Sequence, residues 1–346
     1  MTKHIYLCTD NRSHLPHYAT LMASVLANTP GEIAFHIVHT GLTEEDRQSL
    51  ERLYAHAPSS GVGHTTRMTA VGADLCVRPG EHIGSPLRHD APLRATCPSS
   101  HTVTLHEIDE AHIRPWATTE GLERLSLGAY YRLVIPLIAP VDAGRALYLD
   151  YDIIADGDLS PLWAIDMEGK AIGMVRELLN PDWPDKCNSG VVLFNLDALR
   201  RLPYAHLITE YTATHRLPFH DESILNGAFA GNIHFLPTEY NIITPYLKFG
   251  NAIKHGIHKR LPRPAIIHYV MTKPWEVRCR NPLWHRYFRY RQQTAWRLPR
   301  AALLRFRATR FLKRLFDLER VYNDRRESRW QLRILFFFQF NLGKSK

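Results

Sequence analysis

Cysteine is scarce in this sequence, and the few cysteines present do not form a recognisable site. Five are scattered along 346 residues, and no two form a Cys-x-x-Cys pair. This argues against a zinc site or a disulfide framework and is typical of a reducing compartment. Long apolar runs are missing too, since no stretch approaches the roughly 20 residues that a membrane-spanning helix needs. We also expect no signal peptide, because the first residues lack an apolar region followed by small residues.

Acidic residues are scarce near the C-terminus, which makes the net charge of +9 a misleading average. Residues 278–346 contain 19 Lys and Arg against 4 Asp and Glu, a balance of +15, whereas residues 1–277 contain 24 against 30, a balance of −6. The sequence therefore predicts an acidic catalytic or binding body, residues 1–280, and a basic tail, residues 281–346. Such asymmetry favours binding to a polyanionic partner, either a membrane surface or a nucleic acid.

Aromatic and aliphatic residues recur in the tail at spacings of three and four, between Arg and Lys; they include Trp284, Tyr287, Phe288, Leu303, Phe306, Phe311 and Leu312. This pattern predicts basic amphipathic helices. Helices of this kind lie in the plane of an anionic membrane. We therefore expect a cytoplasmic protein attached to the inner face of the cytoplasmic membrane. Single-stranded nucleic acid is the alternative partner for such a tail, and we do not expect it.

Strand and helix signals alternate at the start of the chain. Residues 5–8 and 33–38 are predicted strands, residues 16–28 a helix, and Thr43 the N-cap of another helix. This alternation predicts an α/β fold with a parallel sheet. Residues 58–101 interrupt it, because they are rich in Pro, Gly, Ser, Thr and His and show no sustained period. We predict a surface insertion there.

Two carboxylates follow the most strongly apolar of the predicted strands. Asp150 and Asp152 come after the run 147–149 and before two isoleucines. Side chains two residues apart in an extended chain share a face, so both should point to one place at the end of a strand, where open α/β sheets bind ligands. A divalent cation would relieve their repulsion and leave open positions for phosphate oxygens. The pair therefore favours a nucleotide diphosphate site over the alternative of a solvated strand end.

Further polar residues adjoin other predicted strands. His268 ends a short apolar strand and should lie at the same sheet edge as the two aspartates; imidazole with carboxylates favours Mn²⁺, although Mg²⁺ stays open. Lys273 follows, at a place where diphosphate charge would collect; the alternative is a solvated lysine at a turn. Asn188 precedes a buried run and either binds sugar hydroxyls or forms a turn. The adjacent acids Asp221 and Glu222 open a predicted helix, residues 220–229, where catalysis and pairing with the helix dipole explain them equally well.

These motifs, in this order, resemble family 8 of the retaining glycosyltransferases, which includes bacterial lipooligosaccharide and lipopolysaccharide hexosyltransferases and glycogenin. The motifs are Thr9-Asp10, Tyr131-Arg132-Leu133, Asp150-Tyr151-Asp152, Asn188-Ser189-Gly190, Asp221-Glu222, His268 and Lys273-Pro274-Trp275. The resemblance covers roughly residues 4 to 290. It implies a GT-A fold, a Rossmann-like, mostly parallel sheet flanked by helices, which binds a UDP-sugar and Mn²⁺.

The resemblance also implies a role for each matching residue. The metal ligands are Asp150, Asp152 and His268. The nucleotide contacts are Thr9, Asp10, Asn11, Asp150, Tyr151 and Lys273. The donor sugar contacts are Arg132, Asn188, Asp221 and, by a looser match, Glu177. The implied activity is transfer of galactose or glucose from a UDP-sugar to a saccharide, which we expect to be lipopolysaccharide core or another lipid-linked glycan.

This sequence departs from the family pattern at two places. Glu222 stands where the family normally has Gln, next to the anomeric carbon; we predict catalytic roles for Glu222 and Asp221. The usual His-x-x-Gly-x-x-Lys-Pro-Trp spacing is one residue shorter between His268 and Lys273, and it has no Gly. The altered loop after His268 leaves a catalytically inactive sugar-nucleotide-binding or scaffold protein as the alternative.

Overall fold

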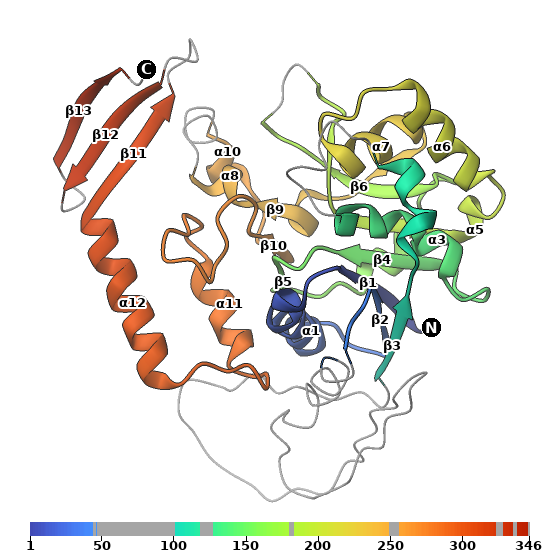
Figure 1. The fold of residues 1–346 in the computed structure, drawn as a ribbon, viewed down its shortest axis with the longest axis horizontal. Helices are drawn as coiled ribbons and strands as arrows, with labels where there is room; N and C mark the ends of the chain where they lie inside the picture. The colour runs from blue at the N-terminus through green and yellow to red at the C-terminus, as the bar shows by residue number, and fades with distance from the viewer. Residues whose placement is uncertain are drawn as a thin grey trace, which may run out of the picture.

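The computed structural model describes residues 1–43, 46, 101–117, 127–179, 183–248, 256–322, 328–334 and 338–344. Its centre is a seven-stranded sheet in the order β3-β2-β1-β4-β7-β6-β8 (Figure 1). The strands are β1 (Lys3–Thr9), β2 (Ile33–His39), β3 (His101–Glu107), β4 (Arg145–Leu149), β6 (Ile172–Arg176), β7 (Cys187–Asn195) and β8 (Ile233–Phe235). All neighbouring pairs are parallel except those of β7, which runs antiparallel to β4 and to β6. The mostly parallel α/β sheet expected from the sequence is confirmed.

The reversed direction of β7 decides which residues meet. Strands β1, β4 and β6 run the same way, so they end at one edge of the sheet, and β7 begins at that edge. Polar residues that follow β1, β4 and β6 are thereby placed beside the first residues of β7. The same edge binds ligands in other open α/β sheets.

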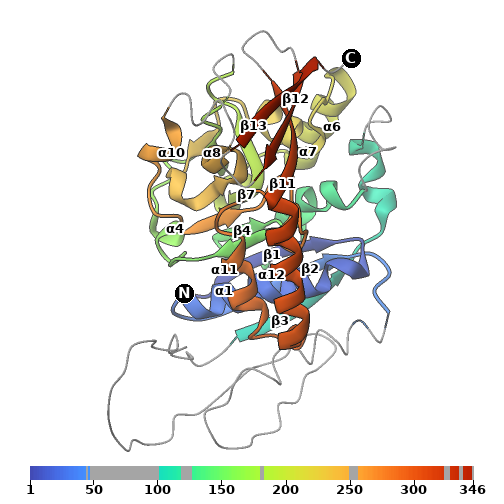
Figure 2. The same cartoon turned by 90° about the vertical axis from the view of Figure 1, so that its left-hand side faces the viewer.

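Alternate residues of the central strands enter two cores, one on each face of the sheet. In β4, Leu147 and Leu149 belong to one core, whereas Ala146 and Tyr148 belong to the other. Burial on both faces explains why these strands read as continuous apolar runs. The helices that flank the sheet are α1 (Leu15–Asn28), α3 (Ile135–Ile138), α4 (Pro161–Ala164), α5 (Leu196–Leu199), α6 (Tyr204–Thr214) and α7 (His220–Ala228). Figure 2 shows α1 beside the sheet and next to α11.

Short 3₁₀ helices connect several of these elements. They are η1 (Arg12–His14), η2 (Glu110–His112), η3 (Arg114–Trp116), η4 (Leu127–Val134) and η5 (Thr238–Asn241). The segment around Tyr131 and Arg132 is helical, and most of it is the tighter 3₁₀ form of η4. The N-cap predicted at Thr43 is confirmed, since the Asp46 N–H donates to Thr43 Oγ1 at 3.2 Å. The rest of that helix and residues 58–100 of the predicted insertion lie outside the described residues; His101 begins β3.

A second, smaller sheet has the order β5-β10-β9. Its strands are β5 (Ile153–Ala155), β9 (Ile242–Ile243) and β10 (Ile266–His268), and it is accompanied by α8 (Thr244–Lys248) and α10 (Ile257–Arg260). Strand β10 pairs antiparallel with β5 and parallel with β9. Since β5 follows β4 after three residues, the small sheet lies next to the edge where β4 ends (Figure 1).

The basic tail is helical only in its first half. Helix α11 (Trp284–Arg291) packs against α1, and α12 (Arg300–Leu315) packs against α11 through Phe306 and Phe288, whose ring centroids are 4.9 Å apart. The next residues form a three-stranded antiparallel sheet of β11 (Phe316–Tyr322), β12 (Ser328–Ile334) and β13 (Phe338–Lys344). The expectation of helices is therefore wrong beyond Leu315. Residues 329–334 alternate polar and apolar, a period of two that indicates a strand.

Within the described ranges, no helix combines the length and the apolar run that crossing a bilayer requires. The proposed division at residue 280 into a catalytic domain and a membrane-binding tail stays a prediction.

Candidate active site

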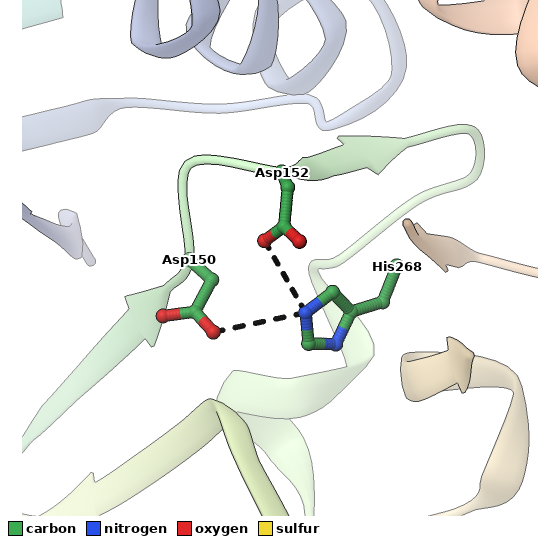
Figure 3. A group of neighbouring side chains, drawn as sticks. All are labelled: Asp150, Asp152 and His268. Carbon is green, nitrogen blue, oxygen red and sulfur yellow. Dashed lines mark ion pairs between the residues drawn. The ribbon is translucent and has the colours of Figure 1, made fainter. Parts of the chain in front are cut away.

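Asp150, Asp152 and His268 form a compact group beside the end of β4 (Figure 3). His268 Nε2 lies 3.3 Å from Asp152 Oδ1 and 3.7 Å from Asp150 Oδ2. One ligand atom from each residue lies within 4.8 Å of the other two, so a single cation could contact all three. The predicted metal-ligand set is therefore brought together in space.

The physical reason for this convergence differs from the one inferred from the sequence. Asp150 and Asp152 lie on the tight connection between β4 and β5 and not on one extended strand. His268 ends β10, so it comes from the small sheet and not from the edge of the large one. The turn directs both carboxylates toward the small sheet, and the pairing of β10 with β5 places His268 opposite them (Figure 3).

His268 is held with one ring nitrogen facing the aspartates. Its Nδ1 lies 2.9 Å from Oδ1 of Asn241, an oxygen that can only accept, so Nδ1 carries the proton in this contact. In a neutral ring with this orientation, the lone pair on Nε2 would face the aspartates and could bind a metal. Gly190 makes room for the ring, because a Cβ at that position would lie 2.9 Å from His268 Nδ1 and 2.8 Å from Asp150 Oδ2. The donor set and its support fit a divalent cation such as Mn²⁺.

Lys273 forms a hydrogen-bonded ion pair with Asp152 Oδ2, and Asp152 is 4% exposed. Burial raises the pKa of Asp152, but the adjacent Lys273 and His268 outweigh it and hold that pKa well below the ordinary value. Asp152 is therefore ionised across the physiological range. The lysine expected at the diphosphate thus lies directly beside the predicted metal ligands.

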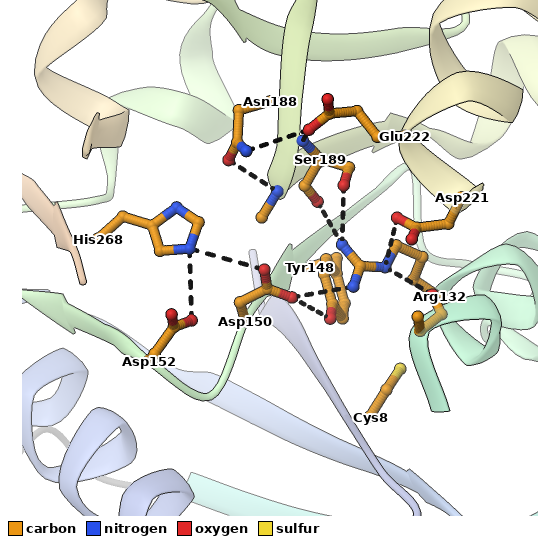
Figure 4. A network of polar contacts seen from close by, with 12 residues as sticks. Cys8, Arg132, Tyr148, Asp150, Asp152, Asn188, Ser189, Asp221, Glu222 and His268 are labelled. Atoms are coloured by element: carbon orange, nitrogen blue, oxygen red, sulfur yellow. Dashed lines mark hydrogen bonds and ion pairs between the residues drawn. The ribbon is translucent and has the colours of Figure 1, made fainter. Parts of the chain in front are cut away.

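Asp150 is fixed by two donors on its other oxygen (Figure 4). The Tyr148 hydroxyl donates to Asp150 Oδ1 at 2.5 Å, and Arg132 Nη2 lies 3.0 Å from the same atom. Oδ2 is left to face His268. Tyr148 lies near the end of β4, two residues before Asp150, which begins the connection to β5.

Arg132 occupies the centre of the polar network in Figure 4. In addition to the contact of its Nη2 with Asp150, Arg132 makes two further contacts. Its Nε lies 3.3 Å from Asp221 Oδ2, and its Nη1 donates to the Ser189 carbonyl at 2.7 Å. Burial raises the pKa of Asp221 to about 6, although Arg132 acts in the opposite direction. All three guanidinium nitrogens have protein partners, so in this structure Arg132 positions Asp150 and Asp221.

Glu222 contacts Lys186 and the first residues of β7. Its Oε2 accepts from Asn188 Nδ2 at 3.1 Å and from the Ser189 N–H at 3.3 Å, and its Oε1 is 2.8 Å from Lys186 Nζ. Asn188 Oδ1 in turn accepts from Asn241 Nδ2 at 3.0 Å, and Asn241 also binds the ring of His268. A run of hydrogen bonds therefore connects Glu222 with the metal-ligand group. Glu177 joins through Lys186 Nζ, 3.2 Å away.

Apart from Lys273, which follows β10, the predicted nucleotide contacts lie at the end of β1 and between β4 and β5. Thr9 is buried and its hydroxyl donates to the Asn11 carbonyl at 3.0 Å, so this side chain shapes the turn. Asp10 lies against Gly128, where a Cβ would come within 2.6 Å of Asp10 Cγ. The Tyr151 ring stacks on His14 with centroids 4.1 Å apart and an interplanar angle of 15°.

Sequence reasoning missed four residues of this site: His14, Tyr148, Lys186 and Asn241. Tyr148 could have been found, because it stands two residues before Asp150 at the end of the same apolar run. Lys186 stands two residues before Asn188, but its two carboxylate partners, one directly after β6 and one in α7, are not apparent from its neighbours in sequence. Asn241 and His14 gave no comparable local signal.

Comparison with known proteins assigns a family to this arrangement. The family model described as "Glycosyl transferase family 8" matches residues 93–279, more than half of the chain. Glycosyltransferase GlyB of Streptococcus pneumoniae is 31% identical over 171 residues, which cover 46% of this chain and 41% of GlyB. Lipopolysaccharide 1,2-glucosyltransferase of Escherichia coli (strain K12) is 27% identical over 192 residues, which cover 50% of this chain and 55% of that enzyme. The matches thus span about half the length of these two relatives.

Solved structures share the fold. The galactosyltransferase LgtC in complex with donor and acceptor sugar analogs matches 89% of this chain and 100% of its own, with a TM-score of 0.60 and 18% identity. An active-site mutant of LgtC gives the same TM-score at 19% identity. At this identity the likeness concerns the fold, and it confirms the GT-A architecture.

Proposed function

Because the chain belongs to glycosyl transferase family 8, we propose that it transfers galactose or glucose from a UDP-sugar to a saccharide acceptor with retention at the anomeric carbon. The observation that supports this most directly is the connection between two functional groups. A metal-ligand set, Asp150, Asp152 and His268, is joined by the hydrogen bonds of Asn241 and Asn188 to a buried carboxylate, Glu222. A sugar nucleotide needs both parts, one for its phosphates and one for its sugar.

Each end of the site has residues suited to one part of the donor. Mn²⁺, when held by Asp150, Asp152 and His268, supplies positive charge that stabilises the phosphates of departing UDP. Lys273 adds a second cation at the same end, and its ammonium can donate to a phosphate oxygen. Asp10 and the stacked Tyr151 and His14 are proposed to meet the nucleoside, with Thr9 and Asn11 forming the turn that carries Asp10.

The sugar end contains the proposed catalytic acids. The side-chain oxygens of Asn188, Asp221 and Glu177 can accept hydrogen bonds from sugar hydroxyls, the Asn188 amide can also donate one, and Arg132 holds Asp221 in place. Glu222 can act by either of two routes that retain configuration. It can attack the anomeric carbon and be displaced by the acceptor oxygen, as in retaining glycosidases, or it can stabilise a same-face transition state by charge alone.

The acceptor is proposed to be lipopolysaccharide core or another lipid-linked glycan, with the enzyme bound peripherally to the inner face of the cytoplasmic membrane. Helix α12 supports this through its outward face. Leu304, Phe311 and Leu312 are 64%, 58% and 59% exposed and share a face by their spacing of seven and eight. Exposed cations surround them at Arg300, Arg305, Arg307 and Lys313. Apolar side chains beside cations suit an anionic bilayer surface.

The test is UDP release from UDP-glucose, UDP-galactose and UDP-N-acetylhexosamines, with and without acceptor saccharide. We expect turnover of one donor with Mn²⁺ and loss of turnover in EDTA. Asp152→Asn should lose the metal-dependent rate while its circular dichroism matches wild type. Full activity in EDTA would refute the metal assignment, and UDP binding without release from any donor would identify an inactive sugar-nucleotide-binding protein.

A further inference from the structure

A buried lysine that the roles above do not use lies beside Glu222. The side chain of Lys186 is 7% exposed, and its Nζ lies 2.8 Å from Glu222 Oε1 and 3.2 Å from Glu177 Oε2. The ammonium also lies over the ring of Phe219, 4.1 Å from the centroid. Two carboxylates and an aromatic face therefore hold one cation in a defined place.

We propose that Lys186 is a positioning residue that keeps Glu222 ionised and fixed in orientation beside the donor sugar. This inference rests on the proposed function, because it takes Glu222 as the carboxylate that faces the anomeric carbon. It adds a residue to the reacting site that neither the sequence motifs nor the metal-ligand set contains.

The contacts of Glu222 show why its orientation depends on Lys186. Both hydrogen bonds from β7, those of Asn188 Nδ2 and the Ser189 N–H, reach the same oxygen, Oε2. Lys186 binds the other oxygen, Oε1. A carboxylate held at one oxygen alone can rotate about that contact, whereas one held at both oxygens has a fixed plane. Lys186 therefore supplies the second point of attachment.

The charge of Lys186 matters because acids surround Glu222. The titratable groups that act on Glu222 or are acted on by it are Lys186, Glu177, Asp221, Cys187 and Tyr246. Burial raises the pKa of Glu222, and the hydrogen bond and charge of Lys186 oppose that rise. A protonated Glu222 is neither a nucleophile nor a source of negative charge for an oxocarbenium-like centre. Loss of the cation should therefore inactivate the site at the acid end of its pH range.

Glu177 gives Lys186 a second anchor. Since Nζ contacts both carboxylates, Lys186 remains held by Glu177 when Glu222 engages the sugar. Glu177 also raises the pKa of Glu222 by its negative charge. Removing Glu177 should consequently have the opposite effect on Glu222 from removing Lys186.

The pH dependence of kcat/KM for Mn²⁺-dependent turnover of the accepted UDP-sugar tests this proposal. In Lys186→Met, we expect the acid limb to move to higher pH by about one unit, which is a tenfold loss of rate on that limb. Lys186→Arg should leave the acid limb at its wild-type pH, because it keeps the positive charge. Glu177→Gln should move the limb to lower pH, and this variant tests the proposal even if Lys186→Met fails to fold.

The outcomes separate this inference from the proposed function. If Lys186→Met lowered the rate equally at every pH and left the acid limb in place, Lys186 would have only a structural role and the proposal would be overturned. An acid limb in Glu177→Gln that does not move to lower pH would also overturn it. Absence of any metal-dependent turnover of UDP-sugars by the wild-type enzyme would instead refute the proposed function.

Discussion

Gly190 is the residue on which the close packing of the metal-ligand group depends. A Cβ there would lie within 3 Å of both His268 Nδ1 and Asp150 Oδ2. Real Cβ atoms do not approach polar atoms this closely, so an alanine must displace at least one of the two ligands. The need for a small residue at the fourth position of β7 follows from where β10 lies, and the sequence of β7 alone does not indicate it.

Gly190→Ala should weaken Mn²⁺ binding by about 10–100-fold, the usual cost of disturbing the support of a metal ligand. Isothermal titration with Mn²⁺ measures this directly. Gly144→Ala is the matched control, since a Cβ there meets only the side chain of Asp197, which is 65% exposed. Equal Mn²⁺ affinity in the two alanine variants would count against the assignment of Asp150 and His268 as ligands.

Glu222→Gln distinguishes the two routes of sugar transfer. Gln keeps the shape but removes the charge and the ion pair with Lys186. If Glu222 forms a covalent bond to the sugar, the transfer rate should fall by orders of magnitude, because an amide is a poor nucleophile. Single-turnover rates and the anomeric configuration of the product are the measurements. Near wild-type turnover with retention in Glu222→Gln would rule out an obligatory nucleophile.

At the scale of elements, the loop between β10 and Lys273 shows how the shortened motif is accommodated. Met271 adopts a positive φ of 73° and is 62% exposed. It stands three residues after His268, the position that holds Gly in the family pattern. The backbone therefore takes the left-handed conformation without the residue that favours it.

Met271→Gly should stabilise the protein by up to about 1 kcal/mol. The left-handed conformation costs a non-glycine residue roughly 1–2 kcal/mol, and the greater freedom of an unfolded glycine offsets part of the gain. Urea unfolding gives the difference in free energy. Val270→Gly is the control, because its φ is not positive and glycine there should destabilise. If Met271→Gly were less stable than Val270→Gly, the assignment of backbone strain to Met271 would be wrong.

At the scale of the whole molecule, the first half of the tail is built into the body. Arg310 Nη1 donates to the Val277 carbonyl at 3.0 Å and its guanidinium lies over the ring of Trp284, 4.7 Å away. Deleting residues 299–346 would therefore also expose Trp284 and Phe288. Substitution of the outward face of α12 is the cleaner test of membrane attachment.

The triple variant Leu304→Gln/Phe311→Gln/Leu312→Gln should lose most of its binding to anionic vesicles, since its apolar contacts with the bilayer are gone, while activity on a soluble acceptor stays. Raised salt should weaken wild-type binding, because each basic residue near an anionic surface contributes about 1 kcal/mol. Vesicle sedimentation measures both effects. Leu137→Gln/Val141→Gln, at two other exposed apolar positions, is the control. Undiminished vesicle binding by the triple variant would contradict this face, and salt-sensitive binding to DNA alone would favour nucleic acid.

The sequence by itself determined the strands and the residues that end them. Apolar runs fixed β1, β2, β4, β7 and β10, because burial on two faces leaves little choice of residue. Asp150, Asp152 and His268 stood out because polar residues directly follow or end apolar runs at these positions. The prediction of helices in the tail is correct up to Leu315. It is wrong beyond that residue, where residues 329–334 alternate polar and apolar with a period of two and belong to strand β12.

Only the tertiary structure decided how these ends face one another. The run of apolar residues in β7 carries no information on its direction, yet its antiparallel course brings Asn188 and Lys186 to the edge where β4 and β6 end. The contacts of Asn241 with His268 and of Lys186 with Glu222 join segments 27 and 36 residues apart. Such pairings depend on strand order and direction, which local patterns of burial leave open. The proposed metal ligands and catalytic acids could therefore be predicted from the sequence, whereas the contacts of Asn241 and Lys186 that orient them could not.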